Sequence, residues 1–254
     1  MPPRPYVLAE TNWRAVEDTR FDVAVLPWGA TEPHNYHLPY GTDNYETGAI
    51  AERAAELAWK AGAKVVVLPT VPFGVNTGQL DLKLALNMNP STQLALLTDL
   101  SVALAGQGVR KLLILNGHGG NDFRQMIREL QPGVDSFICT INWWTCVGAT
   151  EYFDEPGDHA GEMETSVMMA VQPDLLLPLS EAGSGEAKKF RLAGLRAGWA
   201  WAPRQWSKVT SDTGTGNPSA STPSKGEKFL DAVVNRIGGF LIDLARADLN
   251  DMYE

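Results

Sequence analysis

Four short apolar runs, each followed by a loop rich in glycine, proline or polar residues, constrain the fold of this chain most strongly. They are DVAVLP (22–27), KVVVLPTVP (64–72), VRKLLILN (109–116) and DSFICTINWW (135–144). Short apolar runs bounded by turn signals are typical of buried strands, and the β-branched residues of 64–72 strengthen that interpretation. Prolines end that run, as they commonly end strands. The sequence therefore predicts a buried sheet.

Helical segments separate these runs. Residues 46–60 are rich in alanine, and Asn89-Pro90 has the pattern of a capping side chain followed by proline in the first turn of a helix that extends to Gly106. Shorter helices are expected over 122–130 and 161–171, and a long amphipathic one over 227–247. Because strands alternate with helices, we expect a mainly parallel sheet covered on both faces.

No clear boundary divides the chain, so we expect a single α/β domain over residues 1–254. Region 180–225 differs from the rest: it is rich in Gly, Ser, Pro and Thr and has little periodicity. Three tryptophans, at positions 199, 201 and 206, favour an ordered loop region over a disordered linker. A lid or a subunit contact is the expected role of this region.

Charge and composition exclude several classes of function. The formal net charge is −9, from 30 acidic and 21 basic residues, and no basic cluster offsets it, so no nucleic-acid partner is expected. Two cysteines are too few for a disulfide framework. The sequence has no apolar run of signal-peptide length at its start and no membrane span, so we expect a cytoplasmic protein with no membrane partner.

All four histidines lie in three short motifs. These motifs are WGATEPHNYHLPYGTD (28–43), LNGHGGN (115–121) and GDHAGEMETS (157–166). The first two begin where a predicted strand ends, and the tryptophans of INWW fall at the end of a third strand. Ligands of open α/β sheets bind beyond the carboxyl ends of the strands. We therefore expect the motifs to converge at one edge of the sheet.

The residue types in these motifs favour a metal site. Glu32, His34, His37 and Asp43 lie within twelve positions of one another, and carboxylate with imidazole suits zinc, manganese or iron. Asp43 has two oxygens and could bridge two ions, and His118 could project into the same space. Two ions roughly 3.5–4 Å apart can generate hydroxide from water and polarise a carbonyl.

Each motif also has a purely structural interpretation. The Glu32-x-His34 pair could be a surface hydrogen-bonding pair, and His159 could cap the helix that follows it. Carboxylates are favoured in the first turn of a helix, which alone could account for Glu162 and Glu164. Tryptophan pairs such as Trp143 and Trp144 belong more often to a core or an interface than to a substrate pocket.

The three motifs, in this order and at roughly these spacings, resemble those of the creatininase family (creatinine amidohydrolase and relatives). The segment GTGNPSASTPSKGEKF (214–229) is also similar to a family segment that precedes the last helix. The resemblance covers most of the chain. It implies a three-layer α/β/α sandwich with a mainly parallel central sheet, two divalent metal ions per chain, and assembly as a homohexamer. It also implies hydrolysis of a C–N bond in a small amide or cyclic amide.

The resemblance also implies a role for individual residues of this chain. One ion would be held by Glu32, Asp43 and His118, and the second by His34 and the bridging Asp43. His159 matches the catalytic histidine that passes a proton between nucleophile and leaving nitrogen, and Glu164 matches the glutamate of the family's H-A-G-x-x-E-T-S motif. Zinc is the first expectation for both ions, with manganese or iron as alternatives.

The chain departs from creatininase itself in two places. Gly120 replaces a glutamate that binds the second ion there, so we expect Glu164 as the replacement ligand, with Glu162 as the alternative. Segment 74–89 lacks the family's Ser/His-containing loop. Asn76, Thr77 and Gln79 are expected to contact substrate instead, with Trp143 and Trp144 as walls of the pocket.

The sequence thus predicts a metal-dependent amidohydrolase acting on a small molecule, with hydroxide from a metal-bound water as the nucleophile. Two alternatives keep the same site: a formamide deformylase and a lactone hydrolase. A third is a non-catalytic family member, which the presence of every ligand-type residue disfavours.

Overall fold

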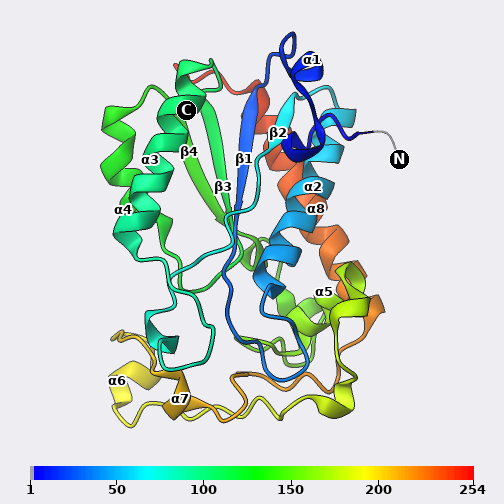
Figure 1. Cartoon of the computed structure of the whole chain (residues 1–254), viewed down its shortest axis with the longest axis vertical. Helices are drawn as coiled ribbons and strands as arrows, with labels where there is room; N and C mark the ends of the chain where they lie inside the picture. Colours follow the sequence, from blue (N-terminus) through cyan, green and yellow to red (C-terminus); the bar gives the residue numbers. More distant parts are fainter. Residues whose placement is uncertain (1–2) are drawn as a thin grey trace.

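The computed structural model describes residues 3–254, and a four-stranded parallel sheet lies at its centre (Figure 1). The strands are β1 (Val23–Trp28), β2 (Val65–Val67), β3 (Lys111–Asn116) and β4 (Phe137–Asn142), in the order β2-β1-β3-β4. All four predicted strands are present, and every pairing is parallel. This confirms the predicted fold class.

Two strands are shorter than the sequence pattern suggests. β2 covers only three residues of the predicted run 64–72, because Pro69 and Pro72 have no N–H group to donate to a strand ladder. β4 ends at Asn142, and the two tryptophans after it form a 3-10 turn over Trp143–Thr145. These tryptophans therefore leave the sheet at its carboxyl edge.

The register of the strands places the first two histidine motifs side by side. Trp28 at the end of β1 pairs with Asn116 at the end of β3, and Asn116 pairs with Asn142 at the end of β4. β2 lies on one side of β1, whereas β3 and β4 lie on the other. The strand order therefore reverses between β1 and β3, which is the position where open parallel sheets bind ligands.

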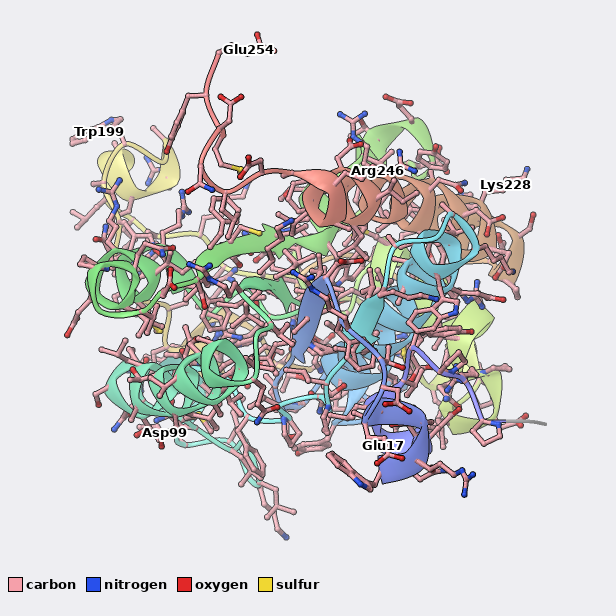
Figure 2. The ribbon with its side chains drawn as sticks, turned by 90° about the horizontal axis from the view of Figure 1, so that it is seen from above. Glu17, Asp99, Trp199, Lys228, Arg246 and Glu254 are labelled. Carbon is pink, nitrogen blue, oxygen red and sulfur yellow. The ribbon has the colours of Figure 1, made fainter. Side chains whose placement is uncertain are left out.

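Helices cover both faces of the sheet, as Figure 2 shows from above. One face packs against α2 (Thr42–Lys60), α5 (Glu162–Val171) and α8 (Pro223–Arg246), and the other against α3 (Pro90–Gly106) and α4 (Phe123–Leu130). Successive strand residues point to opposite faces. Accordingly, Val25 and Leu113 belong to the core on the α8 side, and Leu26 and Leu112 to the core on the α3 side.

The ends of some helices differ from the prediction. α2 begins at Thr42 instead of residue 46, which places Asp43 in its first turn. Asn89 does not cap α3, because its side-chain oxygen accepts a hydrogen bond from the Asn87 amide at 2.8 Å. The Thr222 hydroxyl does cap α8, accepting from the Lys225 N–H at 3.2 Å.

Region 180–225 crosses beyond the carboxyl ends of the strands (Figure 1). Before α8 begins at Pro223, this region has two short α-helices, α6 (Ala193–Arg196) and α7 (Trp206–Val209). α1 (Trp13–Val16), near the start of the chain, is equally short. Trp199 and Trp201 are 81% and 86% exposed. Over residues 3–254, the helices all lack the combination of length and apolar character that crossing a membrane requires.

The crossing of α8 over α5 depends on Gly226. A Cβ atom at this position would lie 1.8 Å from the Ser166 carbonyl oxygen, so Gly226→Ala should force the helices apart. We expect it to lower the free energy of unfolding by about 1–3 kcal/mol, the usual cost of overpacking, measured by urea denaturation. Gly239→Ala on the same helix faces open space and should raise stability by about 0.5–1 kcal/mol. Equal stabilities of the two variants would contradict this account.

Candidate metal centre

The loop between β1 and α2 is held in a shape that turns its ionisable side chains inward. Asn35 has a positive φ of 56°, a conformation that asparagine tolerates better than most residues. Its side-chain oxygen accepts from the Gly183 N–H at 2.8 Å, which anchors the loop to a distant segment. The Glu32 N–H donates to the Tyr40 carbonyl at 3.1 Å and closes the loop on itself.

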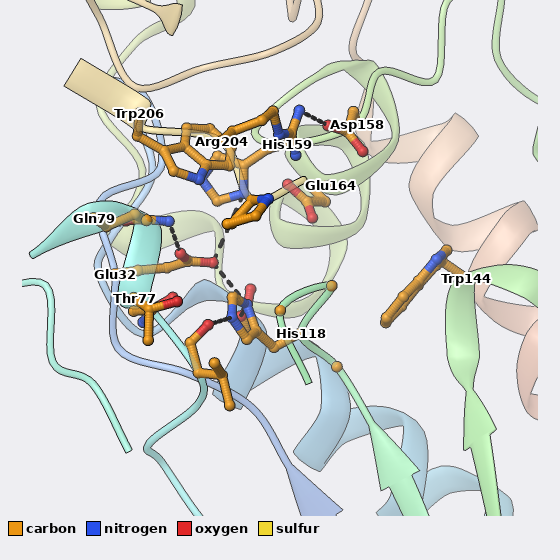
Figure 3. A pocket seen from close by; sticks show the side chains of 18 of the residues that line it. Glu32, Thr77, Gln79, His118, Trp144, Asp158, His159, Glu164, Arg204 and Trp206 are labelled. Atoms are coloured by element: carbon orange, nitrogen blue, oxygen red, sulfur yellow. Dashed lines mark hydrogen bonds and ion pairs between the residues drawn. The ribbon is translucent and has the colours of Figure 1, made fainter. Parts of the chain in front are cut away.

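Five side chains converge at the carboxyl edge of the sheet, and Figure 3 shows Glu32, His118 and His159 among them. His34 Nε2 lies 2.9 Å from Asp43 Oδ1, His118 Nδ1 lies 2.9 Å from Glu32 Oε1, and His159 Nδ1 lies 3.8 Å from the same Glu32 oxygen. All five residues are buried. The three sequence motifs thus meet at one point, as expected from the parallel sheet.

In each of the three cluster histidines, one ring nitrogen faces the carboxylates and is here the inner nitrogen. The other, outer nitrogen contacts a backbone carbonyl. The pairs are His34 Nδ1 with Glu32 O at 3.0 Å, His118 Nε2 with Val75 O at 3.1 Å, and His159 Nε2 with Pro33 O at 2.9 Å. A carbonyl can only accept, so each outer nitrogen donates its proton. In a neutral ring the inner nitrogen is then an acceptor that faces the carboxylates. Metal-binding histidines are usually held in this way.

Electrostatics in the cluster favour positive charge beside the carboxylates. Burial by itself would lower the pKa of His34, but the Asp43 carboxylate and its hydrogen bond raise that pKa to about 9. Burial would likewise raise the pKa of Asp43, yet the charges and hydrogen bonds of His34 and His118 bring it below its usual value. Protons on the imidazoles or divalent cations can both supply this charge, and they compete for the same nitrogens.

Two of the groups of side chains that could hold a metal ion share Asp43. Ligand atoms of Glu32, Asp43 and His118 lie within 4.8 Å of one another, and so do those of His34, Asp43 and Glu164. A third such group joins Glu32, His34 and His159. Mixed carboxylate and imidazole ligands of this kind suit zinc, manganese or iron.

Of the two glutamates at the start of α5, the structure brings Glu164 to the cluster. Its carboxylate accepts from the N–H of Ala160, a residue with a positive φ of 53°. Burial raises the pKa of Glu164. Glu162 instead pairs with Lys225 of α8 and accepts from the Glu155 N–H at 2.9 Å. Of the two glutamates that the sequence offered, Glu164 therefore lies beside the cluster and Glu162 lies away from it.

His37 shares a motif with His34 but does not join the cluster. Its Nε2 lies 2.9 Å from the Thr165 hydroxyl of α5. Burial, followed by the charge of His34, lowers the pKa of His37 to about 4. This histidine therefore connects the loop to α5.

The residues that are predicted to contact substrate differ in what their side chains contact in this structure. Gln79 donates to the Glu32 carboxylate, so in this structure it orients that carboxylate. The Asn76 amide donates to the Leu86 carbonyl at 3.0 Å. Thr77 and Trp144 border the cavity above the cluster (Figure 3). Trp143 borders it too but is 1% exposed and packs against Phe229, as a core residue does.

Region 180–225 contributes two side chains, Trp206 and Arg204, that were not among the predicted site residues. The Trp206 ring meets the His159 ring edge-on, with 4.7 Å between centroids. The Arg204 guanidinium lies 4.7 Å from the Trp206 ring and pairs with Asp158, the neighbour of His159 (Figure 3). These residues are more than forty positions away from His159, and no motif marks them.

One cavity lies over the cluster, and a second cavity adjoins it. The first, of about 340 Å³, includes Glu32, His118 and His159 in its walls. The second, of about 980 Å³, shares Asp158, Trp201 and Arg204 with the first. Among the described residues that line the second cavity, Asp158 is the one acid, and six are cationic: Lys188, Lys189, Arg191, Arg196, Arg204 and Lys208. The second cavity is therefore positively charged in a chain whose net charge is negative.

Comparison with known proteins finds relatives that are similar to this chain over most of its length. The mycofactocin precursor peptide peptidase of Mycobacterium tuberculosis is 28% identical over 222 residues, which are 83% of this chain and 81% of the peptidase. The crystal structure of "Putative creatinine amidohydrolase" from Bacteroides fragilis is 45% identical, has a TM-score of 0.92, and is matched over 98% of this chain and 99% of its own.

Solved creatininases share the fold at lower identity. A form described as Zn-Zn type and a manganese form are both 22% identical to this chain, with TM-scores of 0.76 and 0.78. Each is matched over 96% of this chain and 100% of its own. The sequence profile of Creatininase, described as creatinine amidohydrolase, matches residues 9–241. This chain therefore belongs to the creatininase family.

Proposed function

We propose that this protein is a metal-dependent hydrolase that cleaves a C–N bond in a small amide or cyclic amide. The observation that carries the proposal is the set of three histidines whose outer nitrogens donate to backbone carbonyls while their inner nitrogens face carboxylates. Family membership supports hydrolase activity.

Two groups of ligands fit the two ions. Glu32, Asp43 and His118 would hold one, and His34, Asp43 and Glu164 the other. Zinc is the first candidate, since a relative exists in a Zn-Zn form, and manganese or iron would suit the same ligands. Such ions supply a water-derived nucleophile at neutral pH and Lewis-acid polarisation of a carbonyl.

The chain itself provides the proton transfer and the positioning. His159 Nε2 is held by the Pro33 carbonyl, so Nδ1 can take a proton from the nucleophile and return it to the departing nitrogen. Trp206 covers one edge of this imidazole and limits its movement. Gln79 fixes the orientation of the Glu32 carboxylate.

The size of the first cavity supports a small substrate. Its volume of about 340 Å³ is near the lower end of the roughly 300–1,000 Å³ that ligand pockets occupy. A second candidate is cleavage of a peptide amide, which the larger adjoining cavity and the peptidase relative favour. In that case the cationic walls would bind the carboxylates of the peptide.

Metal content provides the first test. We expect about two equivalents of transition metal per chain when the protein is purified without added metal or chelator and analysed by elemental mass spectrometry. The protein should then hydrolyse members of a panel of lactams, formamides, lactones and short acidic peptides, and EDTA should abolish this activity. A protein that contains no metal and takes up none on titration would exclude the proposed mechanism.

A further inference from the structure

The second cavity concentrates positive charge that the proposed mechanism does not use. Six of the chain's 21 basic residues border it, against a single acid among the described residues. That acid, Asp158, pairs with Arg204. Over residues 3–254 the other five cations form no ion pair, whereas Arg53 and Arg110 on other parts of the surface do. In a chain with a net charge of −9, an unbalanced cationic cavity favours an anionic ligand.

Hydrogen bonds within region 180–225 hold the walls of this cavity together. The Lys188 N–H donates to the Val209 carbonyl at 2.8 Å, which joins two segments that both carry lining cations. The Arg196 guanidinium of α6 donates to the Phe190 carbonyl at 3.1 Å and thereby connects the helix to the segment before it. The cations therefore surround a defined cavity instead of being scattered along a loop.

The second cavity adjoins the first one next to His159. Asp158, Trp201 and Arg204 border both cavities, and Asp158 directly precedes His159 in the chain. The Arg204 guanidinium lies 4.7 Å from the ring of Trp206, which in turn meets the His159 ring edge-on (Figure 3). One ligand can therefore extend from the cluster into the second cavity, with the bond to be cleaved beside His159.

Apolar side chains also line the second cavity. Phe190, Leu195 and Trp201 lie in the same walls as the cations, and contacts with them would stabilise an organic ligand but not a bare inorganic ion. The volume of about 980 Å³ is at the upper end of the roughly 300–1,000 Å³ that pockets for small molecules occupy. The walls therefore suit an organic body that carries the negative charge.

We propose that the substrate is an amide whose uncleaved part carries two or more negative charges, which the second cavity binds while the amide lies over the cluster. This inference rests on the proposed function. Carboxylates and phosphates both supply such charge, and lysine and arginine bind both. The requirement is the same for a cyclic amide and for a peptide, because it concerns the end of the substrate away from the bond that is cleaved.

Calorimetric titration of phenyl phosphate and of benzene-1,3-dicarboxylate into the purified protein tests this inference. Both probes are dianions on an aromatic body, and benzene-1,3-dicarboxamide is their uncharged counterpart. We expect each dianion to bind at least about tenfold more tightly than the dicarboxamide, because each partly exposed charge pair contributes a factor of up to about five. The dianion with the lower Kd identifies the preferred group as phosphate or carboxylate.

Two triple variants with the same change in net charge locate the binding. The test variant removes three exposed cations of the second cavity: Lys188→Gln, Lys189→Gln and Arg191→Gln. The control variant removes three exposed cations of α4 and α8: Arg128→Gln, Lys228→Gln and Arg236→Gln. The test variant should bind both dianions about tenfold more weakly and the dicarboxamide unchanged, and the control variant should match the wild type. If the test variant does not fold, Arg191→Gln alone should weaken the dianions up to about fivefold.

Titration of EDTA-treated protein separates this inference from the proposed function. Binding in the second cavity should persist without metal. If the dianions no longer bind after EDTA treatment and bind the test variant normally, they occupy the ions, so the inference is wrong and the proposed function stands. Equal affinity for dianions and dicarboxamide, or equal weakening in the two triple variants, would also overturn the inference. A protein without metal that binds dianions through these cations would instead overturn the proposed function.

Discussion

Asp43→Ala is expected to remove both ions and to lower turnover at least about 10³-fold. Asp43 is the one residue common to the two ligand groups that fit neighbouring ions. Its loss therefore affects both positions at once, and without the ions the pKa of water returns from about 7 toward 15.7. Elemental mass spectrometry of the purified variant and hydrolysis of the best substrate from the panel measure the two effects.

Asp99→Ala is the matched control for this variant. Asp99 is an exposed residue of α3, on the other side of the sheet from α2, and its removal should leave metal content and turnover unchanged. Circular dichroism would establish that both variants are folded. Near-normal activity of Asp43→Ala would mean that Asp43 does not bridge two ions.

His159→Ala is expected to keep both ions while lowering kcat about 10²–10⁴-fold, the usual contribution of a general acid or base. His159 Nδ1 lies 3.8 Å from Glu32 Oε1, farther from that carboxylate than the corresponding nitrogen of His118. Its other nitrogen is fixed by Pro33. The ring is therefore placed to exchange protons beside the ions, which its removal should leave bound.

His37→Gln is a suitable control, because His37 is a buried histidine that contacts Thr165 instead of the cluster. It should keep both ions and most of the activity, although it can lower stability. Metal analysis of His159→Ala decides the role of this residue. Loss of one equivalent would make His159 a ligand of the third group, with Glu32 and His34.

The amino-acid sequence was sufficient to predict the architecture and the location of the site. Apolar runs that end at Gly- and Pro-containing loops predicted the four strands, and alternation with helices predicted their parallel arrangement. Parallel strands end at a common edge, so the motifs after β1 and β3 had to meet there. The convergence of Glu32, His34, Asp43 and His118 follows from this topology, whereas His159 reaches them from the segment that precedes α5.

Local details were less predictable because several interactions compete at each position. Asn89 has the residue type and the following proline of a helix cap, yet its side chain bonds with Asn87. The β-branched run at 64–72 indicates a long strand, but β2 ends at Val67 and pairing with β1 resumes only as an isolated bridge at Val71, because Pro69 has no N–H to donate between them. Gln79, which is predicted to contact substrate, lines the cavity and also donates to Glu32, a contact that its position in the sequence does not indicate.

By itself, then, the sequence determined the sheet, its functional edge and the ligand types gathered there, since these depend on patterns within single elements. Only the tertiary structure decided which acids face the cluster. The sequence favours Glu164 and leaves Glu162 as the alternative, and α8 separates the two in space because Lys225 pairs with Glu162. Trp206 reaches the site only because region 180–225 folds over His159. Such contacts join distant residues, and sequence spacing carries no record of them.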